Sequence, residues 1–152
     1  MPVFELTYPE GAIGPEAREE LLEELTTALL RAERAPDTDF FRSITWSYVH
    51  ELPEGAVRAA GKPVTEPTFK LEVTTPEGAF SDRRRAELVE SATAAISEAA
   101  GLGPEDGLRV WVLMHEVAEG SWGAGGQVIR FQQLAEAAKQ ERESAEAAIP
   151  AS

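Results

Sequence analysis

An internal repeat is the feature of this 152-residue sequence that most limits how it can fold. The stretch TYPEGAI at 7–13 returns as TTPEGAF at 74–80, an offset of 67 residues. WSYVHELPEG at 46–55 returns as WVLMHEVAEG at 111–120, an offset of 65 residues. Because two separate stretches recur in the same order, chance is a poor explanation, and the chain is expected to fold as two similar units.

Each unit has the pattern strand, helix, strand. Apolar residues in both predicted helices recur at i, i+4, i+7 and i+8, which makes one apolar stripe on an amphipathic helix. Two β-α-β units predict an α/β fold, a four-stranded sheet with two helices on one face. The predicted boundaries are 2–8, 15–33 and 42–50 in the first unit, and 68–75, 82–100 and 108–117 in the second.

The repeat also defines the expected domain organisation. We expect a single domain at 1–131, made of the repeats 2–66 and 67–131. The remaining residues, 132–152, are rich in Ala and Glu and are expected to form a helical or flexible tail.

One face of the predicted sheet has no helix to cover it. Its residues include aromatic side chains, either Trp46 and Tyr48 or the residues that alternate with them. Such a face is too apolar to remain in open solvent, so we expect an oligomer that buries it.

Composition excludes several classes of protein. There is no cysteine, so we expect no disulfide scaffold, thiolate metal site or cysteine nucleophile. The sequence has no apolar run of about 18 residues and no signal-peptide pattern, so we expect no membrane association and a cytoplasmic protein. With 27 acidic and 14 basic residues the formal net charge is −13, which disfavours nucleic-acid binding. An anionic substrate would therefore need a local cluster of arginines.

Two short segments, together with the repeat, carry a family resemblance. The chain opens MPVFELTYPEG, with Pro2 at the head of the first predicted strand, where strand geometry alone tolerates proline. The segment HEVAEGSWGAGGQ at 115–127 is similar to the E-x3-G-x-aromatic-G-x-G-G segment of the tautomerase superfamily. The fused duplication resembles the longer members of that superfamily, such as the cis-3-chloroacrylic acid dehalogenases and malonate semialdehyde decarboxylases.

This resemblance implies a tautomerase fold, a homotrimer and a catalytic proline. Removal of Met1 would leave Pro2 as a secondary amine, able to move protons between the enol and keto forms of a small 2-keto acid. The resemblance implies no cofactor and a small-molecule substrate that carries a carboxylate. Only the first unit can supply the amine, because Pro67, near the start of the second, is an internal amide.

The substrate-binding residues depart from the family pattern. Short tautomerases place an arginine just before the first helix, where this chain has Ile13 and Phe80. The remaining candidates are Arg109 at the start of the last strand and, more loosely, Arg42, each of which can also be a solvent-exposed arginine at a strand end. Trp122 falls on the aromatic position of the family's pocket, although core or trimer packing would also explain it.

Two other charged clusters are expected to be structural. The pairs His50-Glu51 and His115-Glu116 cannot each converge on one ion, because adjacent strand residues face opposite ways, so we expect no metal site. Arg83–Arg85 are expected on a solvated helix face, paired with Glu87 and Glu90.

Three functions remain open at this point. The leading hypothesis is a keto–enol tautomerase that uses Pro2 as general acid and base. The second is hydration or decarboxylation of a three-carbon acid. It is disfavoured because the chain has no equivalent of the paired arginines, or of the histidine and glutamate that activate water, in the similar dehalogenases. The third is a trimeric binding protein that has no catalytic activity.

Overall fold

The computed structural model describes residues 2–148. The first unit contains β1 (Val3–Pro9), α1 (Pro15–Glu33), α2 (Asp39–Ser43), β2 (Trp46–Leu52), β3 (Arg58–Ala59) and β4 (Lys62–Pro63). The second contains β5 (Phe69–Pro76), α3 (Asp82–Ala99), the 3-10 helix η1 (Pro104–Arg109), β6 (Val110–Val117), β7 (Gly123–Ala124) and β8 (Gln127–Val128). The helix α4 (Phe131–Ala147) follows. The expected removal of Met1 concerns a residue outside this described part of the chain.

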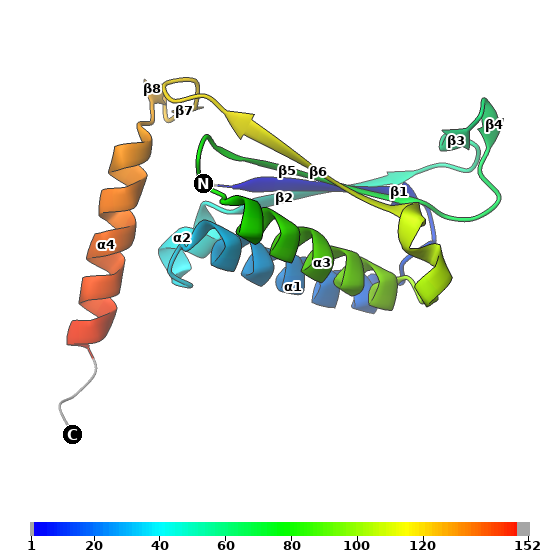
Figure 1. Cartoon of the computed structure of the whole chain (residues 1–152), viewed down its shortest axis with the longest axis horizontal. Coiled ribbons are helices and arrows are strands. Elements are labelled where there is room, and N and C mark those ends of the chain that lie inside the picture. Colours follow the sequence, from blue (N-terminus) through cyan, green and yellow to red (C-terminus); the bar gives the residue numbers. More distant parts are fainter. Residues whose placement is uncertain (1, 149–152) are drawn as a thin grey trace.

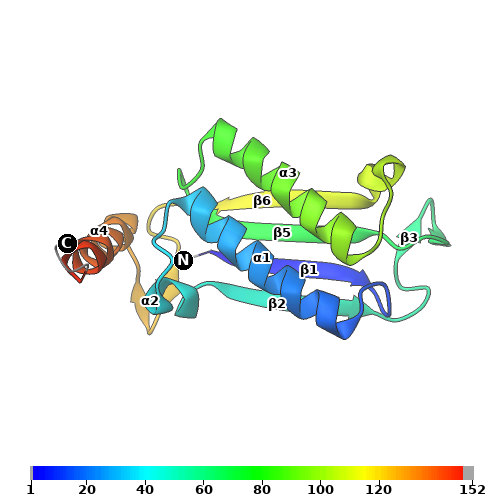
Figure 2. The same ribbon diagram turned by 90° about the horizontal axis from the view of Figure 1, so that it is seen from below.

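Four strands form a mixed sheet in the order β2-β1-β5-β6. The pairs β1–β2 and β5–β6 are parallel, as two β-α-β crossovers require, and the central pair β1–β5 is antiparallel. Helices α1 and α3 lie side by side on one face of this sheet (Figures 1 and 2). The predicted α/β fold class, with two helices on one face of four strands, is confirmed.

The two units are related by a local two-fold axis. Glu5 and Glu72 occupy equivalent positions of the repeat, and they lie directly opposite each other in the β1–β5 pair. The pairs on either side follow the same symmetry. Val3 lies opposite Thr74, the equivalent of Thr7, and Thr7 lies opposite Lys70, the equivalent of Val3. One consequence decides the site geometry: equivalent parts of the two units lie at opposite ends of the sheet.

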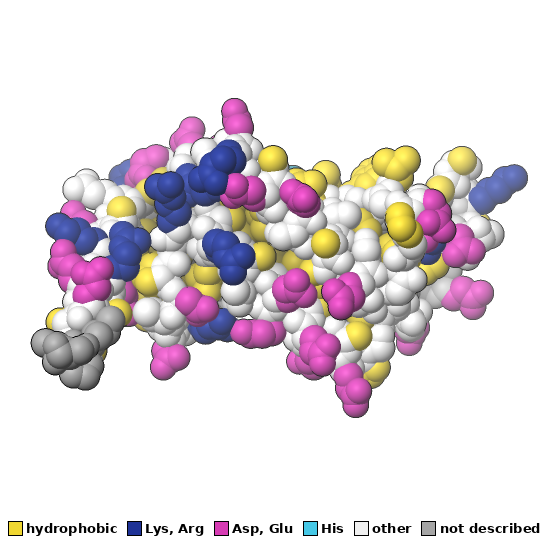
Figure 3. Space-filling view, turned by 60° about the horizontal axis from the view of Figure 1, so that its bottom comes forward, with side chains coloured by type: hydrophobic (Ala, Val, Ile, Leu, Met, Phe, Trp, Pro, Cys, Tyr) yellow, Lys and Arg dark blue, Asp and Glu magenta, His cyan; other side chains and the backbone are white. Residues whose placement is uncertain are grey.

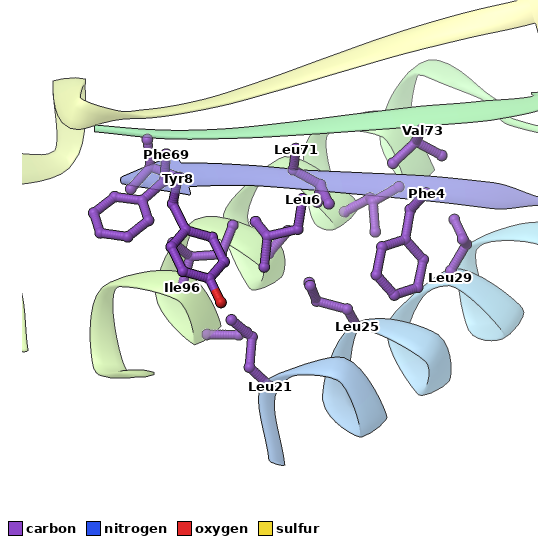
Figure 4. Close-up of a cluster of buried hydrophobic side chains, with 14 of the residues drawn as sticks. Phe4, Leu6, Tyr8, Leu21, Leu25, Leu29, Phe69, Leu71, Val73 and Ile96 are labelled. Atoms are coloured by element: carbon purple, nitrogen blue, oxygen red, sulfur yellow. The ribbon is translucent and has the colours of Figure 1, made fainter. Parts of the chain in front are cut away.

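The core fills the layer between the sheet and the helices. Alternate residues of β1 and β5 point into it, among them Phe4, Leu6 and Val73, each no more than 1% exposed (Figure 4). The predicted apolar stripes of α1 and α3 meet these strand residues. The buried stripe residues are Leu21, Leu25, Leu29 and Ala32 of α1, and Leu88, Ala92, Ala95 and Ile96 of α3.

Each unit also ends in a small hairpin, which the sequence did not predict. Strands β3 and β4 form one hairpin, and β7 and β8 form its equivalent 65 residues later. Both two-residue turns need positive φ angles, which Ala60 and Gly61 adopt in the first and Gly125 and Gly126 in the second. These angles match a turn that follows strand twist. The hairpins project from opposite ends of the sheet (Figure 1).

The last strand of each unit begins later than predicted. Residues 42–45 are not in a strand, because α2 begins after Thr38, whose hydroxyl accepts a hydrogen bond from the Phe41 backbone N–H. Phe41 is buried in a second apolar cluster with Leu30 and Ala138. In the second unit, residues 108 and 109 belong to η1, so β6 begins at Val110.

The sheet face opposite the helices is open within one chain. Trp46 and Trp111 are 61% and 63% exposed, and Tyr48 and Leu113 are exposed beside them. The prediction of an uncovered aromatic face is thus confirmed for the single chain. Helix α4 lies beyond one end of the sheet, where Ala138 packs on α1 and α2. No described helix is long and apolar enough to cross a membrane.

Candidate functional site

Pro2 is seated at one end of the sheet, just before β1. Its side chain is fully buried, and its carbonyl accepts a hydrogen bond from the backbone N–H of Trp46 at 3.2 Å. This bond extends the β1–β2 pairing to the chain's second residue. The end of α1, the start of α3 and the β7–β8 hairpin lie at the same end of the sheet (Figure 1). We call this region the Pro2 end.

A polar pair that the sequence analysis missed lies at the Pro2 end. The register Val3–Thr74 places Thr75 opposite Pro2, and both residues share the helix-facing side of the sheet with Phe4 and Val73. The fully buried Thr75 hydroxyl donates a hydrogen bond to the carboxyl of Glu33, the last residue of α1. Burial raises the pKa of the Glu33 carboxyl, and the Thr75 hydrogen bond opposes that rise.

The repeat itself contains the signal that would have found this pair. Glu33 and Thr75 align with Ala100 and Tyr8, so the polar pair occurs at the Pro2 end and has no counterpart at the other. There Tyr8 packs on Phe69, with ring centroids 6.2 Å apart. Phe69 is the residue that aligns with Pro2. The two ends of the sheet therefore have equivalent backbone positions but different side chains, polar at the Pro2 end and aromatic at the other.

Four arginines line a groove between α1 and α3 that runs to the Pro2 end. Its volume is about 920 Å³, and its cationic residues are Arg31, Arg34, Arg83 and Arg84. Figure 3 shows dark-blue side chains gathered on this part of the helical face, toward α4. Glu24, Glu87 and Glu90 also line the groove. A local cationic cluster therefore exists on a chain whose net charge is −13.

The three consecutive arginines of α3 have three different partners. Arg83 pairs with Glu87 at 2.6 Å, as predicted. Arg84 reaches across to α1, where its guanidinium donates to the Ala32 carbonyl at 3.0 Å. Arg85 pairs with Glu116 of β6 at 2.6 Å, rather than with Glu90. The expectation of a uniformly solvated arginine face is wrong for Arg84, because its side chain binds the last turn of a neighbouring helix.

Arg42 is in α2 and is engaged by other residues of its own unit. Its guanidinium donates to Asp37 at 2.5 and 3.0 Å, to Glu23 at 2.9 Å and to Thr27 at 3.3 Å. These hydrogen bonds raise the pKa of Arg42 and lower that of Asp37. Within one chain, the side chain links α2 to α1.

Arg109 lies at the end of the sheet opposite Pro2. It is the last residue of η1, so the prediction that it starts the last strand is wrong. Its guanidinium donates to the Pro67 carbonyl at 2.8 Å and to Asp106 at 2.9 Å. It also lines a cavity of about 440 Å³ with Arg58, Lys70 and several apolar residues. The length of β5 separates Arg109 from Pro2 by roughly 20 Å.

Trp122 and the two histidines are the remaining residues that the sequence suggested for a site. Trp122 is partly buried at the Pro2 end, and its carbonyl accepts a hydrogen bond from Ile129 that closes the base of the β7–β8 hairpin. His50 and His115 lie on the open sheet face, 3.0 Å from Glu5 and 3.4 Å from Glu72. Among residues 2–148 no group of three acidic or histidine side chains is arranged to hold a metal ion.

The second unit matches a known protein family. Residues 71–132 match the family model named Tautomerase, described as tautomerase enzyme. No curated protein sequence matches the chain.

Solved structures share the fold over most of the chain. Pt0534 inactivated by 2-oxo-3-pentynoate is 23% identical with a TM-score of 0.70, over 87% of this chain and 98% of that one. The Q0 fused 4-OT wild-type symmetric trimer is 19% identical with a TM-score of 0.69, over 86% and 96%. N1, of the cis-3-chloroacrylic acid dehalogenase family, is 20% identical with a TM-score of 0.68, over 97% and 92%. The chain therefore has the fold of these structures, and its second unit matches the Tautomerase family.

The predicted site residues do not all meet within one chain. Pro2, Trp122 and Arg42 lie at the same end of the sheet, and Arg109 lies at the other. Because of the local two-fold axis, the Arg109 cavity is the second unit's counterpart of the Pro2 end. Contact between Arg109 and Pro2 requires two copies of the chain.

Proposed function

We propose that this protein is a keto–enol tautomerase that uses Pro2 as its general acid and base. The substrate class is a small enol or 2-keto acid, and the working form is a homotrimer. The observation that carries the proposal is the seat of Pro2, fully buried at the start of β1 and at the end of the sheet where arginines gather.

The chemistry follows from the burial of Pro2. Removal of Met1 converts the Pro2 nitrogen from an amide into a secondary amine. Burial disfavours the charged form of an amine and lowers its pKa, so that the free base becomes available near neutral pH. The amine can then accept the proton of the enol hydroxyl and donate a proton to the substrate carbon. The amine is therefore unchanged after one cycle.

Arginines are proposed to hold the substrate carboxylate. The Arg31, Arg34, Arg83 and Arg84 groove gives the Pro2 end a local positive potential, which favours the approach of an anion. Arg109 is proposed to bind the carboxylate from a neighbouring copy, because its own Pro2 is at the far end of the sheet. This division of the site between copies supports an assembly such as the trimer named for the fused 4-OT structure.

Two further residues have proposed roles beside Pro2. Trp122 is proposed to form a wall of the pocket and to exclude water, which preserves the low dielectric around the amine. Arg42 is proposed as a second carboxylate ligand, which would require it to exchange Asp37 or Glu23 for the substrate.

The test compares the mature protein with Pro2→Ala. Ketonisation of phenylenolpyruvate and of 2-hydroxymuconate is followed by ultraviolet absorbance, after intact mass has established that Met1 is absent. We expect activity in the parent and a loss of at least about 100-fold in Pro2→Ala, in line with the usual contribution of general acid–base catalysis.

Pro67→Ala is the matched control. Pro67 stands near the start of the second unit, and its carbonyl, which Arg109 uses, is retained in alanine. Parent-like activity in Pro67→Ala together with loss in Pro2→Ala assigns the chemistry to the Pro2 amine. Retention of Met1, or equal activity of the parent and Pro2→Ala, would rule the proposal out.

A further inference from the structure

The Pro2 end differs from the opposite end of the sheet by one coordinated exchange of side chains. At the far end, the cross-strand pair Tyr8–Phe69 fills the helix-facing side with two aromatic rings. At the Pro2 end the equivalent positions hold Thr75 and Pro2, which are much smaller. The volume released there admits the carboxyl of Glu33, where the other helix ends in Ala100.

The ion pairs around the two ends are otherwise alike. Arg18–Glu51 at 2.5 Å and Arg85–Glu116 at 2.6 Å are equivalent in the repeat. At the far end the Tyr8 hydroxyl joins this pair, with 3.4 Å to Glu51. At the Pro2 end Thr75, whose register partner in β6 is Glu116, donates its hydroxyl hydrogen bond to Glu33. The exchange thus creates a second carboxyl at the Pro2 end only.

We propose that Glu33, oriented by Thr75, is the proton partner of the mature Pro2 amine. Thr75 lies opposite Pro2 on the same side of the sheet, and directly opposed side chains in an antiparallel pair are about 5 Å apart. A carboxyl that accepts a hydrogen bond from Thr75 is therefore within reach of the Pro2 nitrogen. In this arrangement the amine and the carboxyl titrate as a coupled pair.

The pair determines which role Pro2 can play. With Glu33 ionised, the protonated amine is favoured and can donate a proton to carbon. With Glu33 protonated, the free amine is favoured and can accept the proton of the enol, so that tautomerisation uses both forms. This consequence for the reaction rests on the proposed function, whereas the coupling of the two groups does not.

Other charged groups also lie at this end of the sheet. Arg84 lies on the carbonyl of Ala32, next to Glu33, and the Arg85–Glu116 pair lies beside Thr75 across β5 and β6. Arg34 is the next residue after Glu33. Burial nevertheless raises the pKa of the Glu33 carboxyl.

The experiment measures the pKa of the Pro2 amine directly by nuclear magnetic resonance of protein labelled with ¹⁵N-proline, without any substrate. Glu33→Gln keeps the shape of the side chain and removes its charge. We expect the amine pKa to fall by about 1 to 2 units in this variant, because an opposite charge nearby favours the protonated amine. Thr75→Val is expected to shift it in the same direction by less, and Thr75→Ser to leave it at the parent value.

Glu20→Gln is the matched control, since it makes the same charge change on an exposed part of the same helix. An equal shift in Glu20→Gln and Glu33→Gln, or no shift in either, overturns the proposal. Ketonisation by each variant is measured separately. If no variant is active but the amine pKa moves as expected, the coupling stands and the tautomerase proposal fails.

Discussion

Leu6 shows how individual residues stabilise this fold. It is wholly buried on β1, opposite Leu71, in the cluster shared with both helices. Truncation to alanine would leave a cavity that neither a strand nor two packed helices can close. We expect Leu6→Ala to lower the free energy of unfolding by about 2.5 to 5 kcal/mol, measured in urea at fixed protein concentration.

Val89→Ala provides the comparison for Leu6→Ala. Val89 is exposed on α3, so its truncation is expected to change the free energy of unfolding by less than about 1 kcal/mol. Similar losses in the two variants would contradict the assignment of the core.

The sequence could suggest some candidate site residues and not others, for a physical reason. Pro2 could be singled out because a proline at the head of a strand has a distinct chemistry that sequence alone reveals. Glu33 could not, because it stands among nine other glutamates and aspartates of the first forty residues, and only its contact with Thr75 distinguishes it. Arg109 was expected at the start of a strand but ends η1, because the predicted strand began two residues too early.

At the scale of the elements, the two long helices end in the same backbone conformation but with different residues. Helix α1 ends with Arg34 at φ 56° and α3 with Gly101 at φ 64°, which are equivalent positions in the left-handed region. Glycine adopts this conformation without the steric cost that a side chain carries. We expect Arg34→Gly to raise the free energy of unfolding by about 0.5 to 1 kcal/mol, and Gly101→Ala to lower it by about 1 kcal/mol.

Urea unfolding of both variants at fixed protein concentration measures this pair. The two variants are expected to change the free energy of unfolding in opposite directions, so each serves as the control for the other. A loss of stability in Arg34→Gly would show that the Arg34 side chain contributes more than its strained backbone costs.

The helix η1 is expected to make stability depend on pH. The Gly103 backbone N–H and the Arg109 guanidinium hydrogen-bond to Asp106 and hold the pKa of its carboxyl below the usual 3.8. A depressed carboxyl pKa stabilises the fold above the unfolded-state value, and this contribution is lost as pH falls through the lower folded-state value. We expect Asp106→Asn to unfold at a lower temperature than the parent at pH 7.

The difference between Asp106→Asn and the parent should shrink as the pH falls below about 4 and disappear in stronger acid. Thermal unfolding followed by circular dichroism across that range measures it. A difference that persists unchanged at low pH would show that the amide disturbs η1 by its geometry rather than by its missing charge.

Elements differ in how far sequence patterns predict them. The strands and long helices follow from periodicity, because burial on one face imposes a regular apolar spacing on Leu21, Leu25 and Leu29 or on Phe4 and Leu6. Helix α2 and η1 are too short for periodicity to show, and local capping by Thr38 and Asp106 decides them. The two hairpins are similarly decided by two-residue turns rather than by apolar patterns.

The whole molecule presents an aromatic sheet face that one chain leaves open. Trp46, Tyr48, Trp111 and Leu113 come from the two edge strands, and the local two-fold axis places equivalent pairs on both sides of Glu5 and Glu72. Burial of this face against other copies is the physical basis of the proposed trimer. A charge inserted in it would have to be desolvated on assembly, which costs several kcal/mol per ion.

We therefore expect Leu113→Glu to shift the protein from trimer to monomer, measured by analytical ultracentrifugation at micromolar concentration. Val89→Glu inserts the same charge on the outer, helical side and is expected to leave the trimer intact. If the site needs Arg109 of a second copy, Leu113→Glu also loses ketonisation activity although Pro2 and its own surroundings are unchanged. A monomeric variant with full activity would instead show that one chain contains the complete site.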